Sequence, residues 1–477
     1  MKHSFYISCL LATLVMGGCA RNPVTGKKEI VTMSEEQEIQ MGKEADPQVI
    51  AQYGLYEDKE LQQYIDRLGQ QIVQVSHRKN IKYEFKIINA EFINAFALPG
   101  GYVYFTRGIM AYFNNEAEFA GVLGHETGHI TARHSVEQQR NQLFGQLGLI
   151  AGLVIAPDLA PFAETASQGL QLLFLKFSRD AEKQADQLGV EYSSRLGYDA
   201  REMAGFFSTL ERQEGDARMP EFLSTHPDPG NRKKTVAKLA ADWQKQLNLT
   251  NPKSNRNTYL QKIDGIMYGQ DPKEGFVENN IFYHPVLKLQ FPIPQGWSYQ
   301  NSPESFQMAP KDGSALMMLT LAKGQSLQDA ASTAMQQYKL TVVDSKESSV
   351  NGLPALVVVA DQQPQQQGGA VIRTLSYFIS YGNNIYHLIG AAQADKFNNY
   401  VETFGATMKN FKQLTDQAML NKKAKRINVV TASGATLRDA LKAKNVPDNM
   451  LEETAILNGM LLTDKISSGT LIKIITQ

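Results

Sequence analysis

The chain has 477 residues, 43% hydrophobic and 20% charged, a length and composition that predict roughly two to four globular domains. Lysine plus arginine and aspartate plus glutamate balance at 48 each. This balance gives no reason to expect nucleic acid as a partner, because that contact relies on clustered positive charge.

The N-terminus is predicted to be a lipoprotein signal peptide, residues 1–18. The apolar run from Phe5 to Met16 has the length of a signal-peptide core and is too short to span a bilayer. The following sequence, MGGC at residues 16–19, resembles a bacterial lipobox and predicts a lipid on Cys19, which would make a membrane one partner. The alternative is an ordinary signal peptide cut nearby. Because Ala20 follows the cysteine, the pattern resembles outer-membrane lipoproteins, so in a Gram-negative host we expect a periplasmic protein anchored to the outer membrane.

Residues 19–247 are predicted to form a mainly helical domain with a small sheet. Residues 21–28 are expected to be a short tether. Apolar residues at helical spacing from Leu61 to Val75 predict a helix, and alternation near 83–87 and 102–105 predicts strands. Further helices are expected near 115–136, 178–196, 199–213 and 230–246. The apolar segment Leu143 to Ile155 is expected to be a buried or lid-like helical hairpin; the alternative is a surface that touches lipid or an unfolded membrane protein.

The predicted helix near 115–136 carries the sequence His-Glu-Thr-Gly-His at residues 125–129. A spacing of four places His125 and His129 on one helical face, where both imidazoles can reach one zinc ion. Glu126 is then placed to take a proton from a metal-activated water without being a ligand itself. The alternative is a chance occurrence of the motif, but two histidines buried in an apolar helix without hydrogen-bond partners would destabilise the fold.

A tetrahedral zinc site needs a third protein ligand. One zinc class supplies a histidine six residues past the motif, but residue 135 is serine, and His134 would point to a different face of a continuing helix. The other class supplies a glutamate from a later helix, and the stretch from Ser178 to Asp186 fits that pattern. We therefore expect Glu182 as the third ligand, with Asp186 hydrogen-bonding a ligand histidine and Arg179 beside them. A solvated helix face is the alternative for these charged residues.

The C-terminal half changes in composition. Residues 248–277 are polar and are expected to be a linker, and residues 278–415 carry alternating apolar runs that predict a mostly β α/β domain. Residues 424–477 are predicted to have the order strand, helix, helix, strand. Their sequences GATL at 434–437, LN at 457–458 and SGTLI at 468–472 resemble a LysM-like module, although Ala435 stands where LysM modules usually have aspartate.

Four separated motifs resemble the HtpX-like and CAAX-protease-like zinc metallopeptidases. These motifs are NAFALPGG at 94–101, the His-Glu-x-x-His segment, the stretch from Ser178, and Thr-His-Pro at 225–227 with Arg232. The lipoprotein start with NPVTG at 22–26 is similar to their periplasmic BepA- and LoiP-like branch. The order of helices, a small sheet and further helices predicts the α+β class, and the resemblance implies a zincin-type fold. It also implies that a substrate strand adds to Asn94, Ala95, Phe96 and Ala97. His226 would stabilise the oxyanion or occupy the open metal position, and Arg232 would hold its loop.

The sequence therefore predicts a metalloendopeptidase of the bacterial cell envelope with one Zn2+ per chain, acting on misfolded or misassembled envelope proteins. The alternative is a chaperone or scaffold lipoprotein that uses the protease fold for binding and docks on peptidoglycan through residues 424–477. Glu126 and a complete ligand set favour the enzyme, because a scaffold need not keep a catalytic carboxylate.

Overall fold

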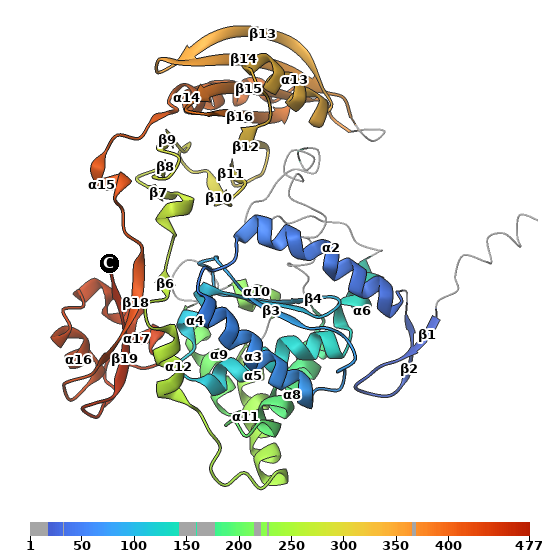
Figure 1. The fold of residues 1–477 in the computed structure, drawn as a ribbon, viewed down its shortest axis with the longest axis vertical. Coiled ribbons are helices and arrows are strands. Elements are labelled where there is room, and N and C mark those ends of the chain that lie inside the picture. The colour runs from blue at the N-terminus through green and yellow to red at the C-terminus, as the bar shows by residue number, and fades with distance from the viewer. Residues whose placement is uncertain are drawn as a thin grey trace, which may run out of the picture.

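The computed structural model describes residues 18–31, 33–142, 159, 177–213, 221–226, 229–364 and 369–477. The predicted signal peptide before Gly18 and the apolar segment Leu143 to Ile155 lie outside the described residues. The described chain is a mixed fold of helices and sheets, in agreement with the predicted α+β class (Figure 1). Among the helices described, none combines the length and apolar character needed to cross a membrane.

The first described residues form a hairpin of β1 (Gly18–Arg21) and β2 (Lys28–Val31), in place of the tether expected at 21–28. The turn is built by Asn22, whose Oδ1 accepts from the backbone N–H groups of Val24 and Thr25 at 2.9 and 3.1 Å. The Asn22 side chain also donates to the carbonyl of Ala132, at 3.4 Å. Local side-chain hydrogen bonds of this kind favour a turn over an extended linker.

Residues 35–246 form the catalytic-type region, in which helices pack around a small sheet. The sheet has the order β3-β5-β4, with β3 and β5 parallel and β4 antiparallel at the edge. The elements are α2 (Glu35–Tyr53), α3 (Lys59–Val75), β3 (Glu84–Ile88), β4 (Ala95–Leu98), β5 (Tyr102–Thr106), α4 (Arg107–Tyr112), α5 (Glu116–Thr131), α6 (His134–Gln142), α8 (Arg179–Arg195), α9 (Glu202–Gln213), α10 (Glu221–Thr225) and α11 (Pro229–Gln246).

The single helix expected at 115–136 is two helices. Asn115 caps the start of α5 by accepting from the backbone N–H of Glu118 at 2.9 Å. The helix ends at Thr131, and Arg133 has a φ of 60°, which turns the chain into α6 at His134. The Arg133 guanidinium pairs with buried Glu38 at 2.9 Å, an ion pair that offsets the cost of this left-handed backbone.

The expected linker at 248–277 is part of the same core. It contains α12 (Arg256–Ile263) and β6 (Met267–Tyr268). Tyr259, Leu260 and Ile263 are fully buried in the hydrophobic core that α5 and α9 share. The polar composition of residues 248–257 hid this short helix from sequence analysis.

The α/β region is an insertion between β6 and the terminal module. Its main sheet has seven antiparallel strands in the order β10-β11-β12-β16-β15-β14-β13. Leu159 is fully buried in the cluster between this sheet and α13. The elements are η4 (Pro272–Glu274), β7 (Phe276–Glu278), β8 (Ile281–His284), β9 (Leu289–Pro292), β10 (Ser298–Asn301), β11 (Ser305–Ala309), β12 (Ala315–Ala322), α13 (Leu327–Gln337), β13 (Leu340–Val350), β14 (Leu353–Gln362), β15 (Ile372–Tyr381), β16 (Asn384–Gln393), η5 (Phe397–Asn399), α14 (Val401–Lys409), β17 (Lys412–Gln413) and α15 (Gln417–Leu420).

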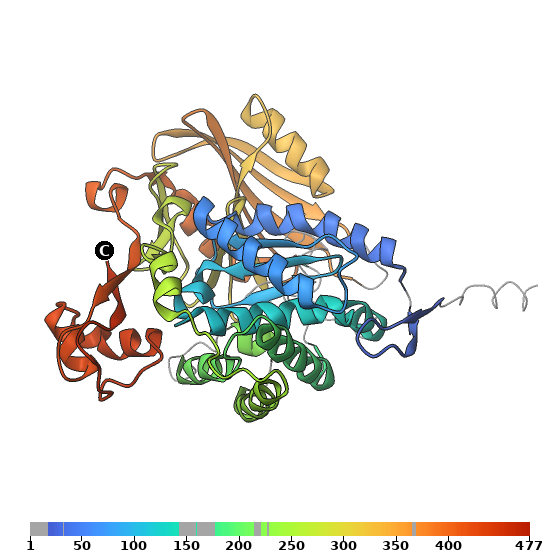
Figure 2. The same ribbon diagram turned by 60° about the horizontal axis from the view of Figure 1, so that its bottom comes forward.

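The chain returns from this insertion beside the point where it left. In the terminal module, β18 pairs with β6 through Lys425↔Tyr268 and Arg426↔Met267. Figures 1 and 2 show the red terminal module beside the yellow-green segment that leads into the insertion. The sheet β19-β18-β6 therefore joins the module to the catalytic-type region. The module consists of β18 (Lys425–Thr431), α16 (Leu437–Ala443), η6 (Asp448–Met450), α17 (Leu451–Leu457) and β19 (Leu471–Thr476).

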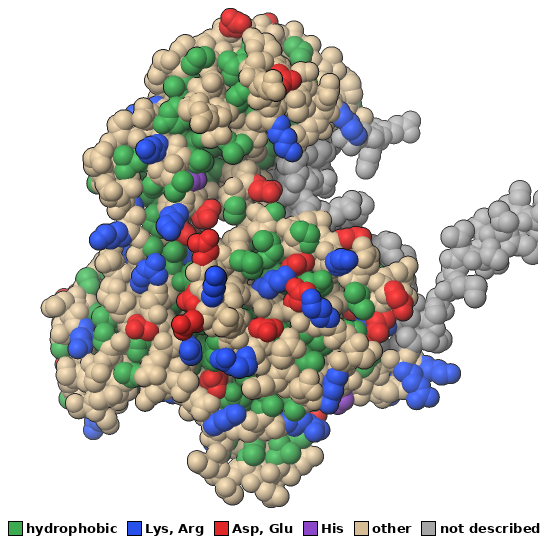
Figure 3. Space-filling model, viewed as in Figure 1, with side chains coloured by type: hydrophobic (Ala, Val, Ile, Leu, Met, Phe, Trp, Pro, Cys, Tyr) green, Lys and Arg blue, Asp and Glu red, His purple; other side chains and the backbone are tan. Residues whose placement is uncertain are grey.

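The surface agrees with the balanced composition. On the face shown in Figure 3, basic and acidic side chains are interspersed among uncharged ones. A mixed surface of this kind gives no extended field to attract a polyanion.

Candidate metal centre

Glycines bring the two helices of the site into close contact. A side chain on Gly189 of α8 would lie 2.8 Å from the carbonyl oxygen of Gly121 and 2.9 Å from the backbone nitrogen of His125, both on α5. One on Gly124 would lie 3.1 Å from the Cα of Gly189. Because no side chain separates the two backbones here, the polar side chains that flank these glycines on the two helices reach one another.

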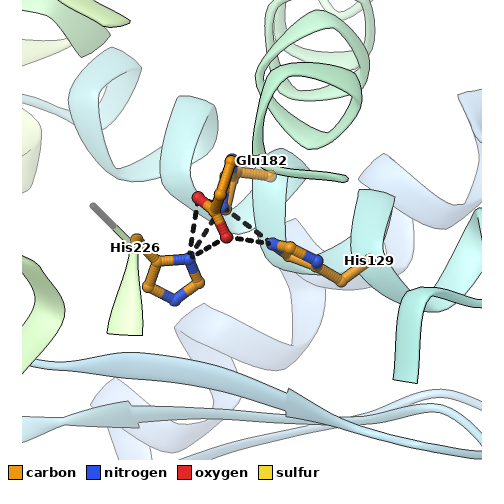
Figure 4. A group of neighbouring side chains, drawn as sticks. His129, Glu182 and His226 are labelled. Carbon is orange, nitrogen blue, oxygen red and sulfur yellow. Dashed lines mark hydrogen bonds and ion pairs between the residues drawn. The ribbon is translucent and has the colours of Figure 1, made fainter. Parts of the chain in front are cut away.

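The structure brings His125, His129 and Glu182 together in one buried cluster. The two Nε2 atoms of the histidines lie 3.0 Å apart. Glu182 is placed by Ser178, whose hydroxyl caps α8 by accepting from the backbone N–H of Ala181. Its carboxylate oxygens lie 3.6 Å from each Nε2 atom, and Figure 4 shows this carboxylate between His129 and His226.

His226 supplies a fourth donor. Its Nδ1 atom lies 3.0 Å from Oε1 of Glu182 and 3.3 Å from Nε2 of His125. The four possible ligand atoms all lie within 4.8 Å of one another. Four atoms each about 2.0–2.1 Å from one tetrahedral ion are separated by about 3.4 Å. Three imidazoles and one carboxylate at these separations therefore fit a zinc ion.

Asp186 and Arg232 hold the back of this cluster. Oδ1 of Asp186 lies 3.0 Å from Nδ1 of His125, which points the Nε2 atom of that histidine at the site. Arg232 binds both carboxylate oxygens of Asp186, at 2.7 and 2.8 Å, and donates to the carbonyl of His226 at 3.1 Å. Burial acts to raise the pKa of Asp186, but the Arg232 charge and its hydrogen bonds outweigh burial and hold that pKa well below its usual value.

The structure does not bring Arg179 into the cluster. Its side chain is exposed at the first residue of α8, whereas Glu182 and Asp186 are buried on the face that meets α5. Arg232, five residues after the Thr-His-Pro motif, pairs with Asp186 instead.

The sequence predicts His134 to be either a helix-end residue or a histidine that supports a metal ligand. In the structure it is both, because it begins α6 and contacts His129. Its Nδ1 atom lies 3.0 Å from Nδ1 of His129, and its Nε2 atom lies 2.9 Å from Oε1 of Gln184. If His129 presents a free Nε2 to a metal, its Nδ1 carries the proton and donates to His134, which in turn donates to Gln184. Phe177 stacks on the His129 ring, with centroids 4.0 Å apart. Sequence analysis missed Gln184 and Phe177, because no spacing rule singles them out.

Glu126 is fully buried beside the donors but accepts no hydrogen bond from any described residue through either carboxylate oxygen. Its nearest charged neighbour is His226, with 3.7 Å between Nε2 and Oε1. Burial raises the pKa of Glu126, and the charges of His226 and His125 offset this only in part. A buried carboxylate without partners normally costs stability, so its presence here points to a chemical role.

Asn94 directly precedes the edge strand β4, which contains Ala95, Phe96 and Ala97. Asn94 is fixed by hydrogen bonds with Thr106, and the backbone N–H of Phe222 on α10 donates to the carbonyl of Ile93 at 3.0 Å. Strand β4 therefore runs close to the helix that leads directly into His226. All four predicted substrate-contacting residues are buried.

Comparison with known proteins agrees with this geometry. Residues 59–240 match the profile of Peptidase family M48. The chain is 32% identical over 254 residues to the beta-barrel assembly-enhancing protease of Escherichia coli (strain K12), covering 50% of each protein. It is 36% identical over 165 residues to the mitochondrial metalloendopeptidase OMA1 of Arabidopsis thaliana, covering 34% of this chain and 32% of that protein. The matched part of this chain thus spans about half the length of the first relative and about a third of the second. Residues 59–240, which carry the candidate metal centre, are therefore similar to peptidase family M48.

Proposed function

We propose that this protein is a zinc-dependent metalloendopeptidase. The observation that carries the proposal is the position of Glu126, a fully buried carboxylate without hydrogen-bond partners among the described residues, directly beside a buried group of three histidines and Glu182. A site built only to hold a structural ion has no use for such a residue.

His125, His129 and Glu182 would hold the zinc. When bound, zinc polarises the scissile carbonyl and makes a water molecule a stronger nucleophile. Glu126 takes the proton of that water, for which both of its oxygens have free acceptor capacity, and delivers it to the leaving amine. Its raised pKa makes it a stronger base than an ordinary glutamate.

We propose that the described site is in a resting state, in which substrate has no access to the metal. Catalytic zinc sites keep one position open, whereas four protein donors close it. Nδ1 of His226 lies 3.3 Å from Nε2 of His125, so His226 would fill that position when zinc is bound. Its withdrawal would admit substrate, and His226 or backbone N–H groups would then stabilise the oxyanion.

The proposed substrates are misfolded or misassembled proteins of the bacterial cell envelope. Support comes from the name of the relative, a beta-barrel assembly-enhancing protease, and from β4, an edge strand that pairs only with β5 among the described strands. An extended substrate would add to this edge through Asn94 to Ala97 only once the edge, which is buried in the described state, is exposed. A lipid on Cys19 would hold the protein at the outer membrane on its periplasmic side, and residues 424–477 would contact peptidoglycan.

Casein cleavage by the full-length chain tests the activity. Glu126→Gln should retain zinc and lose cleavage, while the matched control Glu60→Gln, at an exposed position, should cleave as the unmodified chain does. Each variant is also made in a His226→Ala background, so that a closed resting site does not hide activity. Cleavage by Glu126→Gln would disprove the role of Glu126, and absence of cleavage in every zinc-loaded variant would favour the scaffold function.

A further inference from the structure

The terminal module contributes a buried charge to the catalytic-type region. Lys473 on β19 is the only fully buried lysine among the described residues. On β19, Ile472 and Ile474 face the module's own helices, in its small core. Leu471 and Ile475 lie on the opposite face and pack against the core of the peptidase region. Lys473 belongs to this second face, where an apolar residue would be expected.

The Lys473 ammonium binds the corner between α4 and α5. It donates to the carbonyl oxygens of Ala111 and Phe113, at 2.7 and 3.0 Å. These carbonyls lie at the C-terminal end of α4, where helix carbonyls lack internal partners and attract a cation. Asn115, two residues after Phe113, caps α5, so this contact fixes the chain where the metal-binding helix begins.

A buried acid faces this corner from the first turn of α5. Oε2 of Glu118 accepts from the backbone N–H of Asn114 at 2.7 Å. Burial raises the pKa of Glu118 and lowers that of Lys473, while the charge of each favours the ionised form of the other. Glu118 precedes His125 by two helical turns, about 10 Å along the axis.

The contact is built to be close and specific. Lys473 is held by Asn458, whose side chain exchanges two hydrogen bonds of 2.8 Å with the Lys473 backbone. A side chain on Gly459 would lie 2.8 Å from Nδ2 of Asn114, so a larger residue there would require the Asn114 side chain to shift. At the rim, Arg212 of α9 binds the carbonyl of Met460 at 2.7 Å.

We propose that Lys473 is a positioning residue for the active-site helix, and that the terminal module is a structural part of the peptidase. By fixing the start of α5 through Ala111 and Phe113, Lys473 sets where His125 and Glu126 stand relative to Glu182 on α8. The inference depends on the proposed function only for its activity measurement.

The test uses the full-length chain loaded with Co2+ in place of zinc, whose visible spectrum reports ligand geometry. Lys473→Met keeps the length of the side chain and removes its donors. It should change the Co2+ spectrum and lower kcat at least about tenfold. KM for a peptide should change less than about threefold, because the variant alters the metal-binding helix and not the proposed substrate strand. The control Lys442→Met, at an exposed position of the same module, should leave both unchanged.

The double variant Lys473→Met/Glu118→Gln guards against simple unfolding. It removes both buried charges, so it should fold, but it still lacks the hydrogen bonds to the corner. We expect the same altered spectrum and lowered kcat. A wild-type spectrum and wild-type kcat in the folded double variant would overturn the proposal. If neither the unmodified chain nor its His226→Ala form cleaves after metal loading, the proposed function fails, and the Co2+ spectra alone decide the positioning role.

Discussion

The imidazole of His226 and the carboxylate of Glu182 are in direct contact, with 3.0 Å between Nδ1 and Oε1. This contact makes His226 the fourth donor of a set whose other members come from α5 and α8. His226→Ala should therefore free one metal position and raise casein cleavage about tenfold, if most molecules are closed at rest. His284→Ala, in the α/β region, is the matched control. Lower cleavage with zinc retained would instead assign His226 to the oxyanion.

His134 supports His129 from behind through the contact between their Nδ1 atoms. Removing a group that orients a metal-binding histidine typically costs about 10–100-fold in metal affinity. His134→Ala should show a loss in this range when zinc is titrated against a competing chelator. His77→Ala, which removes an imidazole paired with Tyr192, should bind zinc normally. Equal affinity in both variants would show that His134 has no supporting role.

Arg232 neutralises two buried acids, Asp186 and Glu182. Arg232→Met should destabilise the peptidase region by about 3–5 kcal/mol, because both carboxylates stay buried without their cation. Urea unfolding followed by Trp243 fluorescence in a Trp297→Phe background measures this. The exposed pair of Arg201 with Asp199 gives the control: Arg201→Met should cost less than about 1 kcal/mol. Similar losses for both arginines would contradict the account.

The α/β region should lose stability as the pH falls. Burial lowers the pKa of His387 from its ordinary 6.5 to about 3, and its Nε2 atom lies 2.9 Å from the Ser376 hydroxyl. Between these values the unfolded chain binds a proton that the folded chain does not, so stability falls by about 1.4 kcal/mol for each pH unit below 6.5. This slope is measured by urea unfolding followed by Trp297 fluorescence. It should be smaller by this amount in His387→Gln, and an equal slope in both chains would contradict the prediction.

Periodicity predicted most of the elements, because each buries one regular face. The helices near 178–196 and 230–246 appear as α8 and α11, and the strand near 102–105 appears as β5. Breaks were harder to predict. The turn at Arg133 depends on the ion pair of that residue with Glu38, almost one hundred residues earlier. The burial of α12 depends on surfaces contributed by other helices.

The residues of the site also fall into those that a local sequence pattern predicts and those that only long-range contacts bring together. Spacing alone placed His125, Glu126 and His129 on one helix, and a local pattern pointed to Glu182 and Asp186. The contacts of His134 with Gln184 and of Lys473 with the α4–α5 corner join segments 50 and more than 300 residues apart. No local pattern encodes them, since a histidine or a lysine is compatible with many surroundings.

The most direct test of the peptidase assignment is casein cleavage by the His226→Ala chain as zinc is removed and returned. The account predicts one zinc per chain by metal analysis, loss of cleavage when a chelator removes it, and recovery when one equivalent of zinc is restored. The Glu126→Gln form of the same chain should bind zinc equally and stay inactive throughout. Cleavage that persists in the metal-free chain, or in the Glu126→Gln form, would contradict the account.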